Sequence, residues 1–313
     1  MKSIPRNIHV HMLRRLKLFL ALSRTPHGIL DLATPALAAL LWLGGFPRLE
    51  VALLGALTAF AGYTAVYALN DLMDIKTDKL KLRMDGFGNA QNYLDAVMGR
   101  HPVAQGLLSL WEGIVWAAAW AMVALAGAYW LNPICVLIFL AGCFLELIYC
   151  LMLKVSPVRS IISGAVKTSG GIAAVFAVDP HPSPSFLAML FLFLFFWEVG
   201  GQNIPADWND IEEGGHLKSR TIPVKFGPAC SSQVVIGALL LAMVANLALL
   251  RFAAVKFGFV FALACVLAGV FLLLIPAWSL VKGREREQAM ALFNRASYYP
   301  MALLLVVTVR YLV

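Results

Sequence analysis

One stretch, VALLGALTAFAGYTAVYALNDLMDIKTD at residues 51–78, decides the fold and the chemistry expected of this chain. Residues 51–69 carry no charge and form a run long enough to enter a membrane as a helix. The polar part that follows contains Asn70, Asp71, Asp74 and Asp78. On a helix this spacing places all four side chains on one face within about two turns. We therefore expect a membrane-spanning helix that ends in an acidic face.

The composition extends this expectation to the whole chain. Of the 313 residues, 61% are hydrophobic and only 13% are charged, which is unlike a soluble globular protein. Long apolar runs without period-two alternation indicate helices and not a β-barrel. We predict an all-α, polytopic membrane protein with about nine transmembrane helices. The predicted spans are residues 27–46, 50–69, 107–130, 134–152, 160–178, 185–204, 233–250, 257–280 and 290–310.

The basic residues predict the orientation of these spans. Nineteen of the 25 lysines and arginines fall in segments on the side of the N-terminus, against four on the other side. Positive charge gathers on the cytoplasmic side, so we expect the N-terminus and both acidic stretches to be cytoplasmic. The net charge of +8 therefore indicates membrane topology and not nucleic-acid binding. Residues 1–26 are predicted to form an amphipathic interfacial segment, and residues 27–313 the transmembrane domain.

The acidic face of residues 70–78 predicts a divalent metal site. Three crowded carboxylates repel one another beside lipid, and a hard cation such as Mg²⁺ relieves that repulsion. The alternative is a solvated acidic helix end beside neighbouring lysines.

A second acidic stretch follows the sixth span. Asp207, Asp210 and Glu213 are spaced three apart, and Lys218 and Arg220 come shortly after. We expect the long loops 71–106 and 205–232 to form a cap over one site. Two carboxylate clusters can hold two metal ions around a diphosphate whose remaining oxygens bind arginine or lysine. Departure of the diphosphate would leave an allylic carbocation, for which aromatic side chains offer favourable faces.

These motifs resemble the UbiA superfamily of intramembrane prenyltransferases. Asn70-Asp71-x-x-Asp74-x-x-x-Asp78 matches the first signature, and Asp207-x-x-Asp210 followed by Arg220-Thr221 matches the second and its tail. Arg83 lies where the family usually has a basic residue. Arg100-His101-Pro102 resembles an Asn-Arg-Pro segment, with His101 in the usual arginine place. Tyr149-x-x-x-x-Lys154 resembles the segment after the fourth span.

The resemblance implies nine helices around a central cavity and Mg²⁺-dependent transfer of a prenyl group from a polyprenyl diphosphate, with two Mg²⁺ ions. Its catalytic residues would be Asp71, Asp74, Asp78, Asp207 and Asp210. The metal ligands would be these five together with Asn70 and Glu213. The diphosphate contacts would be Asn70, Lys81, Arg83, Arg100, Lys154, Lys218 and Arg220.

One departure from the family concerns Gly214, which stands where the second signature normally ends in Asp. We expect either that Glu213 substitutes or that the second metal is held more weakly. The acceptor stays open among aromatic, quinone-precursor and lipid-like molecules. Lys167 would either bind an anionic acceptor or be a structural lysine, whose charge is paired within the protein or reaches the membrane surface.

Two other functions compete with prenyl transfer. A membrane terpene cyclase would use the same metals and no acceptor. A divalent-cation transporter would instead need carboxylates near the bilayer midplane and broken helices in both halves.

Overall fold

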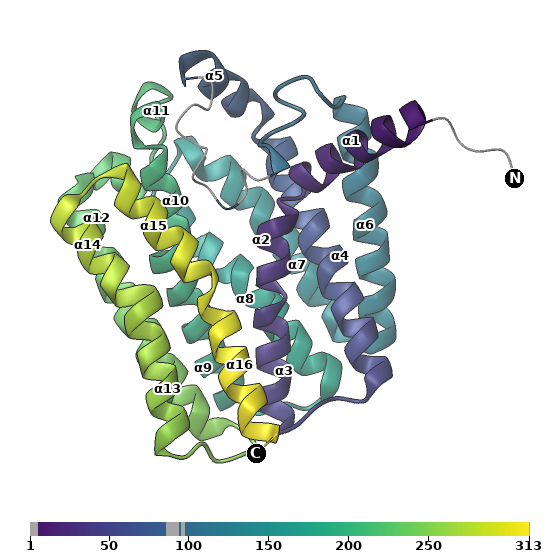
Figure 1. Ribbon diagram of the computed structural model, residues 1–313, viewed down its shortest axis with the longest axis vertical. Coiled ribbons are helices and arrows are strands. Elements are labelled where there is room, and N and C mark those ends of the chain that lie inside the picture. Colours follow the sequence, from purple (N-terminus) through teal and green to yellow (C-terminus); the bar gives the residue numbers. More distant parts are fainter. Residues whose placement is uncertain (1–5, 86–93, 95–97, 313) are drawn as a thin grey trace, which may run out of the picture.

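The computed structural model describes residues 6–85, 94 and 98–312 of the chain (Figure 1). In that part of the chain the secondary structure is entirely helical. Nine of its helical segments are long and apolar enough to cross a bilayer. They are Thr25–Leu43, Leu49–Met73, Leu110–Leu131, Pro133–Lys154, Arg159–Val178, Pro184–Asn209, Ile222–Phe252, Phe259–Gly283 and Arg286–Leu312. The prediction of an all-α multi-pass membrane protein is confirmed.

Apart from residues 86–109 between α5 and α6, the helices follow one another with short connections, and several spans consist of two pieces. The first half of the chain contains α1 Arg6–Leu22, α2 Thr25–Asp31, α3 Ala33–Leu43, α4 Leu49–Met73, α5 Ile75–Asp85, α6 Leu110–Leu131 and α7 Pro133–Leu151. The second half contains α8 Arg159–Val178, α9 Pro184–Trp197, α10 Ile204–Asn209, α11 Ile211–His216, α12 Ile222–Phe252, α13 Phe259–Gly269, α14 Ile275–Gly283, α15 Arg286–Ser297 and α16 Tyr299–Leu312.

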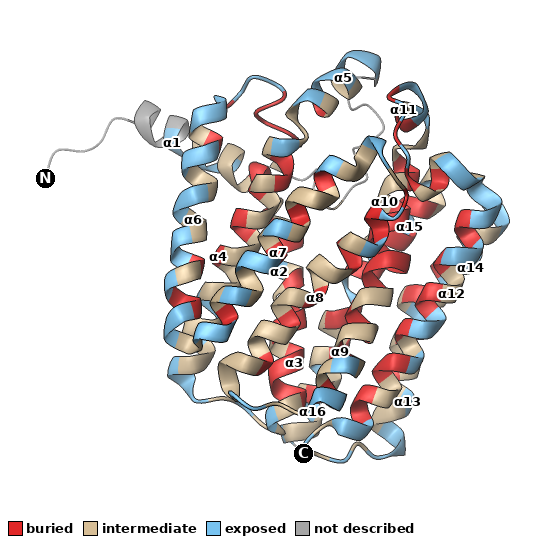
Figure 2. Cartoon of the chain, turned by 180° about the vertical axis from the view of Figure 1, so that it is seen from behind, coloured by how far each residue is buried: buried red, intermediate tan, exposed pale blue. Residues whose placement is uncertain are grey.

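The spans stand side by side in one bundle, with short helices at one end (Figure 1). We call the end that carries α5, α10 and α11 the site end. Close pairs include α4 with α6, α7 with α8, and α9 with α12. Gly127 permits the α4–α6 approach, because a Cβ at that position would lie 2.0 Å from Thr58 Oγ1. Buried residues face the interior of the bundle, and exposed ones such as Trp130 and Phe259 face outward (Figure 2), as expected where lipid is the solvent.

The spans break where the site is built. The sixth span changes from α9 to a π-helical turn, Glu198–Asn203, before it continues as α10. Pro205 near the start of α10 has no backbone N–H to donate, and this favours a change of helical register before it. The fourth helix, α4, ends at Met73, and Asp74 caps it before α5 begins. Both acidic stretches therefore lie at helix junctions and not within continuous helices.

The predicted cap loops are largely helical in the described residues. Loop 205–232 contains α10, α11 and the first turns of α12, which bend at Gly227 with φ of 75°. The seventh span consequently starts well before residue 233, where the sequence predicted it. Loop 71–106 contains α5, and residues 86–93 and 95–97 of that loop lie outside the described residues.

A long cavity of about 680 Å³ runs inside the bundle, as the resemblance implied. Asn70, Tyr149 and Asn203 line it at the site end, and Phe46 and Val51 line it at the opposite end. Apolar side chains form most of its wall, with Tyr63, Tyr67 and Phe139 among the aromatic ones. Its length and lining suit an extended apolar molecule.

Helix α1 lies across the site end beside α4 and α6 (Figure 1). Phe19 stacks on Trp116 with ring centroids 4.9 Å apart, and Arg15 pairs with Glu112. Leu22 is fully buried in a small cluster with Ala68 and Leu108. The described part of the predicted interfacial segment is thus helical and packs against the bundle through its C-terminal half.

Candidate active site

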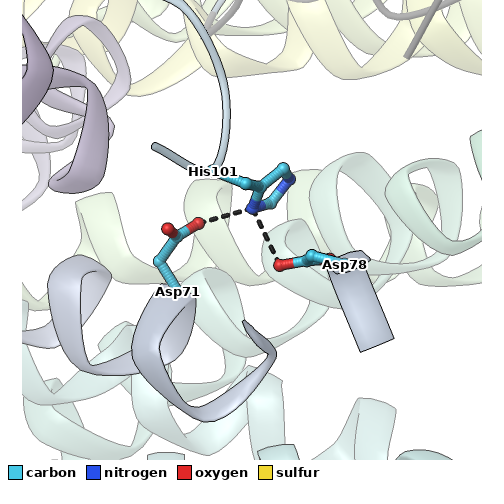
Figure 3. Close-up of side chains that lie close together, drawn as sticks. All are labelled: Asp71, Asp78 and His101. Carbon is cyan, nitrogen blue, oxygen red and sulfur yellow. Dashed lines mark hydrogen bonds and ion pairs between the residues drawn. The ribbon is translucent and has the colours of Figure 1, made fainter. Parts of the chain in front are cut away.

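The first acidic stretch converges on one histidine (Figure 3). His101 Nδ1 lies 2.5 Å from Asp71 Oδ1 and 2.9 Å from Asp78 Oδ2. Asp71 is in the last turn of α4 and Asp78 in the first turn of α5, so the junction brings the two carboxylates to the same side. All three side chains are buried, and each carboxylate is only 2% exposed.

The close contacts change the protonation of this cluster. Burial opposes charge on His101, but the two carboxylates raise its pKa above the ordinary value. Burial alone would raise the pKa of Asp78, yet His101 and Lys81 hold it below its usual range. His101 Nδ1 thus lies where a cation would bind, between two carboxylates.

Asp74 lies at the junction itself and differs from its two neighbours. Its backbone caps α4, and its side chain is half-buried. Burial, with a further contribution from Asp78, raises the pKa of Asp74 to about 6. A carboxylate with a raised pKa has an unmet demand for a cation, which a divalent metal would satisfy.

The second acidic stretch is neutralised by permanent cations. Arg159 donates to Asp207 Oδ1 at 2.9 Å, and Lys81 donates to Asp210 Oδ2 at 2.5 Å. The Lys81 side chain comes from α5, so its ion pair joins the two acidic stretches directly. Burial opposes ionisation of Asp210, but Lys81 and Arg100 hold the pKa of that carboxyl well below its usual range. The structure therefore brings both predicted clusters into one site.

Other polar side chains position the walls of this site. Asn70 donates to Glu146 Oε1 at 2.5 Å and accepts from Arg24 at 3.1 Å. The Arg159 guanidinium lies 4.0 Å from the centre of the Tyr149 ring. Asn203 donates to the Tyr149 hydroxyl at 3.0 Å. These contacts connect four helices where the cavity meets the acidic clusters.

The structure does not place every predicted residue in this group. Arg286 Nη2 lies 2.8 Å from Glu213 Oε1, so this carboxylate is committed to an ion pair on α15. The remaining predicted diphosphate contacts are exposed at the site end: Arg83, Lys154, Lys218 and Arg220. Arg220 donates to the backbone of Val155 at 3.4 Å.

Gly214 occupies a position with no room for a side chain. A Cβ there would lie 2.7 Å from Ser219 Oγ and 3.0 Å from Val224 Cγ2. Ser219 Oγ donates to the Gly214 carbonyl at 2.7 Å, which holds the turn closed. An aspartate at this position would therefore have to displace Ser219 or Val224, and Glu213 pairs with Arg286.

Sequence reasoning missed two central residues. His101 was not among the predicted site residues, yet it contacts two carboxylates. Its position in the usual arginine place of the family segment was the available signal. Arg159 served only to predict orientation, although a basic residue at the start of a buried span needs an acidic partner.

The carboxylate oxygens of this site suit a hard divalent cation as ligands. Asp71 Oδ2 and Asp207 Oδ2 are buried without a hydrogen-bond partner among the described residues. Buried carboxylate oxygens without partners are costly, and oxygen ligands are those that Mg²⁺ prefers. Asp71, Asp78 and His101 also lie close enough together for a metal to bind all three.

The chain is thus a multi-pass membrane protein with two linked carboxylate clusters at one end of the bundle, and Asn70 and Ala206 beside these clusters line its apolar cavity. Residues 32–299 match the UbiA prenyltransferase family, and the chain belongs to this family. The family resemblance predicted from the sequence is confirmed.

Solved structures share this fold at low identity. A UbiA homologue from Aeropyrum pernix K1 in its apo form is 19% identical, with a TM-score of 0.73 over 91% of this chain and 98% of that one. A digeranylgeranylglyceryl phosphate synthase is 18% identical, with a TM-score of 0.65 over 94% and 97%. A UbiA homologue from Archaeoglobus fulgidus bound to DMAPP and Mg²⁺ is 16% identical, with a TM-score of 0.62 over 93% and 99%. No curated protein matches the chain.

Proposed function

We propose that this protein transfers a prenyl group from a polyprenyl diphosphate to an acceptor inside the membrane, and that the reaction depends on Mg²⁺. The observation that carries the proposal is the Lys81–Asp210 ion pair, which joins two acidic clusters whose chain neighbours Asn70 and Ala206 line a long apolar cavity. Carboxylates with nearby cations suit a metal-bound diphosphate, and the cavity suits a prenyl chain.

Each acidic cluster has a role in this proposal. Asn70, Asp71, Asp74 and Asp78 would hold one Mg²⁺, and Asp207 and Asp210 would hold a second. Bound Mg²⁺ would neutralise the diphosphate and make it a better leaving group. We leave Glu213 out of the ligand set because Arg286 already binds it.

The cations of the site would hold the diphosphate oxygens. Lys81 and Arg100 are best placed, because both act on the Asp210 carboxylate at the centre of the site. Arg83, Lys154, Lys218 and Arg220 are proposed contacts at the rim, where they are exposed.

The cavity would bind the prenyl chain below the diphosphate. Tyr63 and Tyr67 line it with ring centroids 6.4 Å apart, and their faces would attract the allylic carbocation. The A. fulgidus homologue bound to DMAPP and Mg²⁺ supports this assignment through its shared fold.

We further propose that the site end faces the cytoplasm. The excess of lysine and arginine in the segments at this end supports that orientation. Glycosylation or cysteine-labelling reporters on the two termini would test it, and we expect the N-terminus to be cytoplasmic.

The function is tested by diphosphate release from geranylgeranyl diphosphate by the purified protein, with Mg²⁺ or with EDTA, followed by mass analysis of the lipid product. We expect release in Mg²⁺ only, and a prenylated product when a membrane extract supplies the acceptor. A cyclised hydrocarbon would indicate a terpene cyclase. No release in any condition would contradict prenyl transfer and favour a binding or transport role.

A further inference from the structure

A second polar cluster lies deeper in the same cavity, among the membrane-spanning helices. Lys167 Nζ lies 2.6 Å from Asp31 Oδ2, 3.3 Å from the Tyr67 hydroxyl and 3.8 Å from Glu198 Oε2. Ser163 donates to Glu198 Oε1 at 2.8 Å. Four helical segments supply these side chains, so the cluster is fixed by the bundle and not by a loop.

The cluster is placed beneath the metal site. Tyr67 is one turn before Asp71 on α4, which is about 6 Å along the helix axis. Lys167 is eight residues after Arg159 on α8, or about 12 Å. Tyr67, Lys167 and Glu198 all line the cavity. A group bound here would therefore lie next to the reacting end of a prenyl chain whose diphosphate is at the acidic clusters.

Glu198 is the member of the cluster with an unmet hydrogen bond. It is 8% exposed, and its Oε2 is buried without a hydrogen-bond partner among the described residues. It begins the π-helical turn Glu198–Asn203, a type of segment that often occurs at functional sites. A buried carboxylate oxygen without a donor is costly unless a ligand supplies one.

We propose that Glu198 binds the hydroxyl of a neutral acceptor, a phenol or an alcohol, and takes its proton during prenyl transfer. This inference rests on the proposed function and names the acceptor class. Lys167 does not make the pocket suitable for an anion, because Asp31 pairs with it and two carboxylates face one lysine. An anionic acceptor would be repelled, whereas an ammonium group has no lone pair with which to attack.

The transfer step balances with the groups already present. The bond between prenyl C1 and the diphosphate oxygen breaks, and its electron pair leaves with the diphosphate. The acceptor oxygen forms the new bond to C1, and the hydroxyl proton passes to Glu198 Oε2. The products are the prenylated acceptor, diphosphate and a protonated Glu198, which later releases its proton to water.

The test uses the purified full-length protein with geranylgeranyl diphosphate and Mg²⁺, and two acceptors that differ in one group. Hydroquinone is neutral, and 4-hydroxybenzoate carries a carboxylate. The readout is the partition ratio, defined as prenylated acceptor formed per diphosphate released. We expect at least a tenfold higher ratio with hydroquinone than with 4-hydroxybenzoate.

Variants assign the effect to Glu198. Glu198→Gln should lower the partition ratio with hydroquinone at least tenfold, and Glu198→Asp, which keeps the carboxylate, should recover part of it. Glu112→Gln removes a carboxylate that pairs with Arg15 and does not line the cavity, and it should keep the wild-type ratio. Thermal unfolding of each variant in detergent checks that it is folded.

Each contrary outcome has a distinct meaning. A preference for 4-hydroxybenzoate, transfer to neither acceptor despite diphosphate release, or an equal loss in Glu112→Gln would overturn the role of Glu198. Absence of diphosphate release by the wild type would instead contradict the proposed function on which the inference rests.

Discussion

The two acidic clusters of the site differ in what neutralises them. In the first, His101 alone lies between Asp71 and Asp78. In the second, Arg159 and Lys81 each pair with one carboxylate. Arginine and lysine keep their charge across physiological pH, and histidine does not. The comparison teaches that each carboxylate of the second cluster already has a permanent cation, whereas Asp71 and Asp78 of the first share one histidine and have the greater demand for a metal ion.

The largest expected effect comes from removing a carboxylate of the first cluster. Asp78→Ala should lower turnover by about 10³-fold or more, because charge stabilisation of the leaving diphosphate would be lost. Diphosphate release in Mg²⁺ measures the effect, and thermal unfolding shows whether the fold is intact. Normal turnover by a folded variant would remove Asp78 from the metal site.

Removing a cation from the second cluster should mainly lower the stability of the folded protein. Arg159→Ala leaves Asp207 buried without its cation, and loss of one partner of a buried pair costs about 3–5 kcal/mol. Thermal unfolding in detergent measures this loss. Arg159→Lys keeps the charge and should be milder, so equal destabilisation by both variants would assign the effect to packing on Tyr149.

Gly214→Asp tests whether restoring the family residue adds a ligand. The new side chain would meet Ser219 and Val224, and overpacking of this kind costs about 1–3 kcal/mol. We expect a lower unfolding temperature and no gain in Mg²⁺ affinity. A higher Mg²⁺ affinity in this variant would contradict this expectation. It would show that the turn can accommodate an aspartate and that this aspartate adds a metal ligand to the second cluster.

His101→Gln distinguishes a competitor of the metal from a ligand of the metal. If the imidazolium competes for Asp71 and Asp78, its removal should lower the half-saturating Mg²⁺ concentration by about threefold to tenfold, or about 0.6–1.4 kcal/mol. Titration of diphosphate release with Mg²⁺ gives this value. A higher half-saturating concentration would instead make His101 a metal ligand.

Glu213→Gln should have the smallest effect. Its carboxylate pairs with Arg286, which also pairs with the exposed Glu212, and a glutamine amide oxygen can still accept a hydrogen bond from this guanidinium. We expect turnover within about twofold of the wild type. This loss of turnover is much smaller than the loss expected when a metal ligand is replaced. A loss as large as that of an Asp207→Asn variant would return Glu213 to the set of metal ligands.

Much of the fold was predictable because lipid imposes simple rules on sequence. Residues 51–69 had to be helical, and the other long apolar runs predicted further membrane-spanning helices in the same way. The spacing of Asp71 and Asp78 likewise predicted that both would face one site. The junction at Asp74 was not predictable, because the i to i+4 pattern of residues 70–78 is the same for one helix as for two.

Contacts between distant segments set the limit of prediction. The partners of Asp71 and Asp207 are His101 and Arg159, which come from other helices or loops and have no spacing relation to the signatures. The role of Lys167 was open for the same reason, since Asp31 lies on a helix far away in sequence. Helix packing decides these pairs, and only the structure shows it.

The central claim is that both clusters hold one metal-bound diphosphate. It is tested most directly by calorimetric binding of geranylgeranyl thiolodiphosphate, a non-reacting analogue, in Mg²⁺ and in EDTA. The account predicts binding in Mg²⁺ only, weakened at least tenfold by Asp78→Asn and also by Asp207→Asn. Equal affinity in EDTA, or affinity unchanged by both variants, would contradict it.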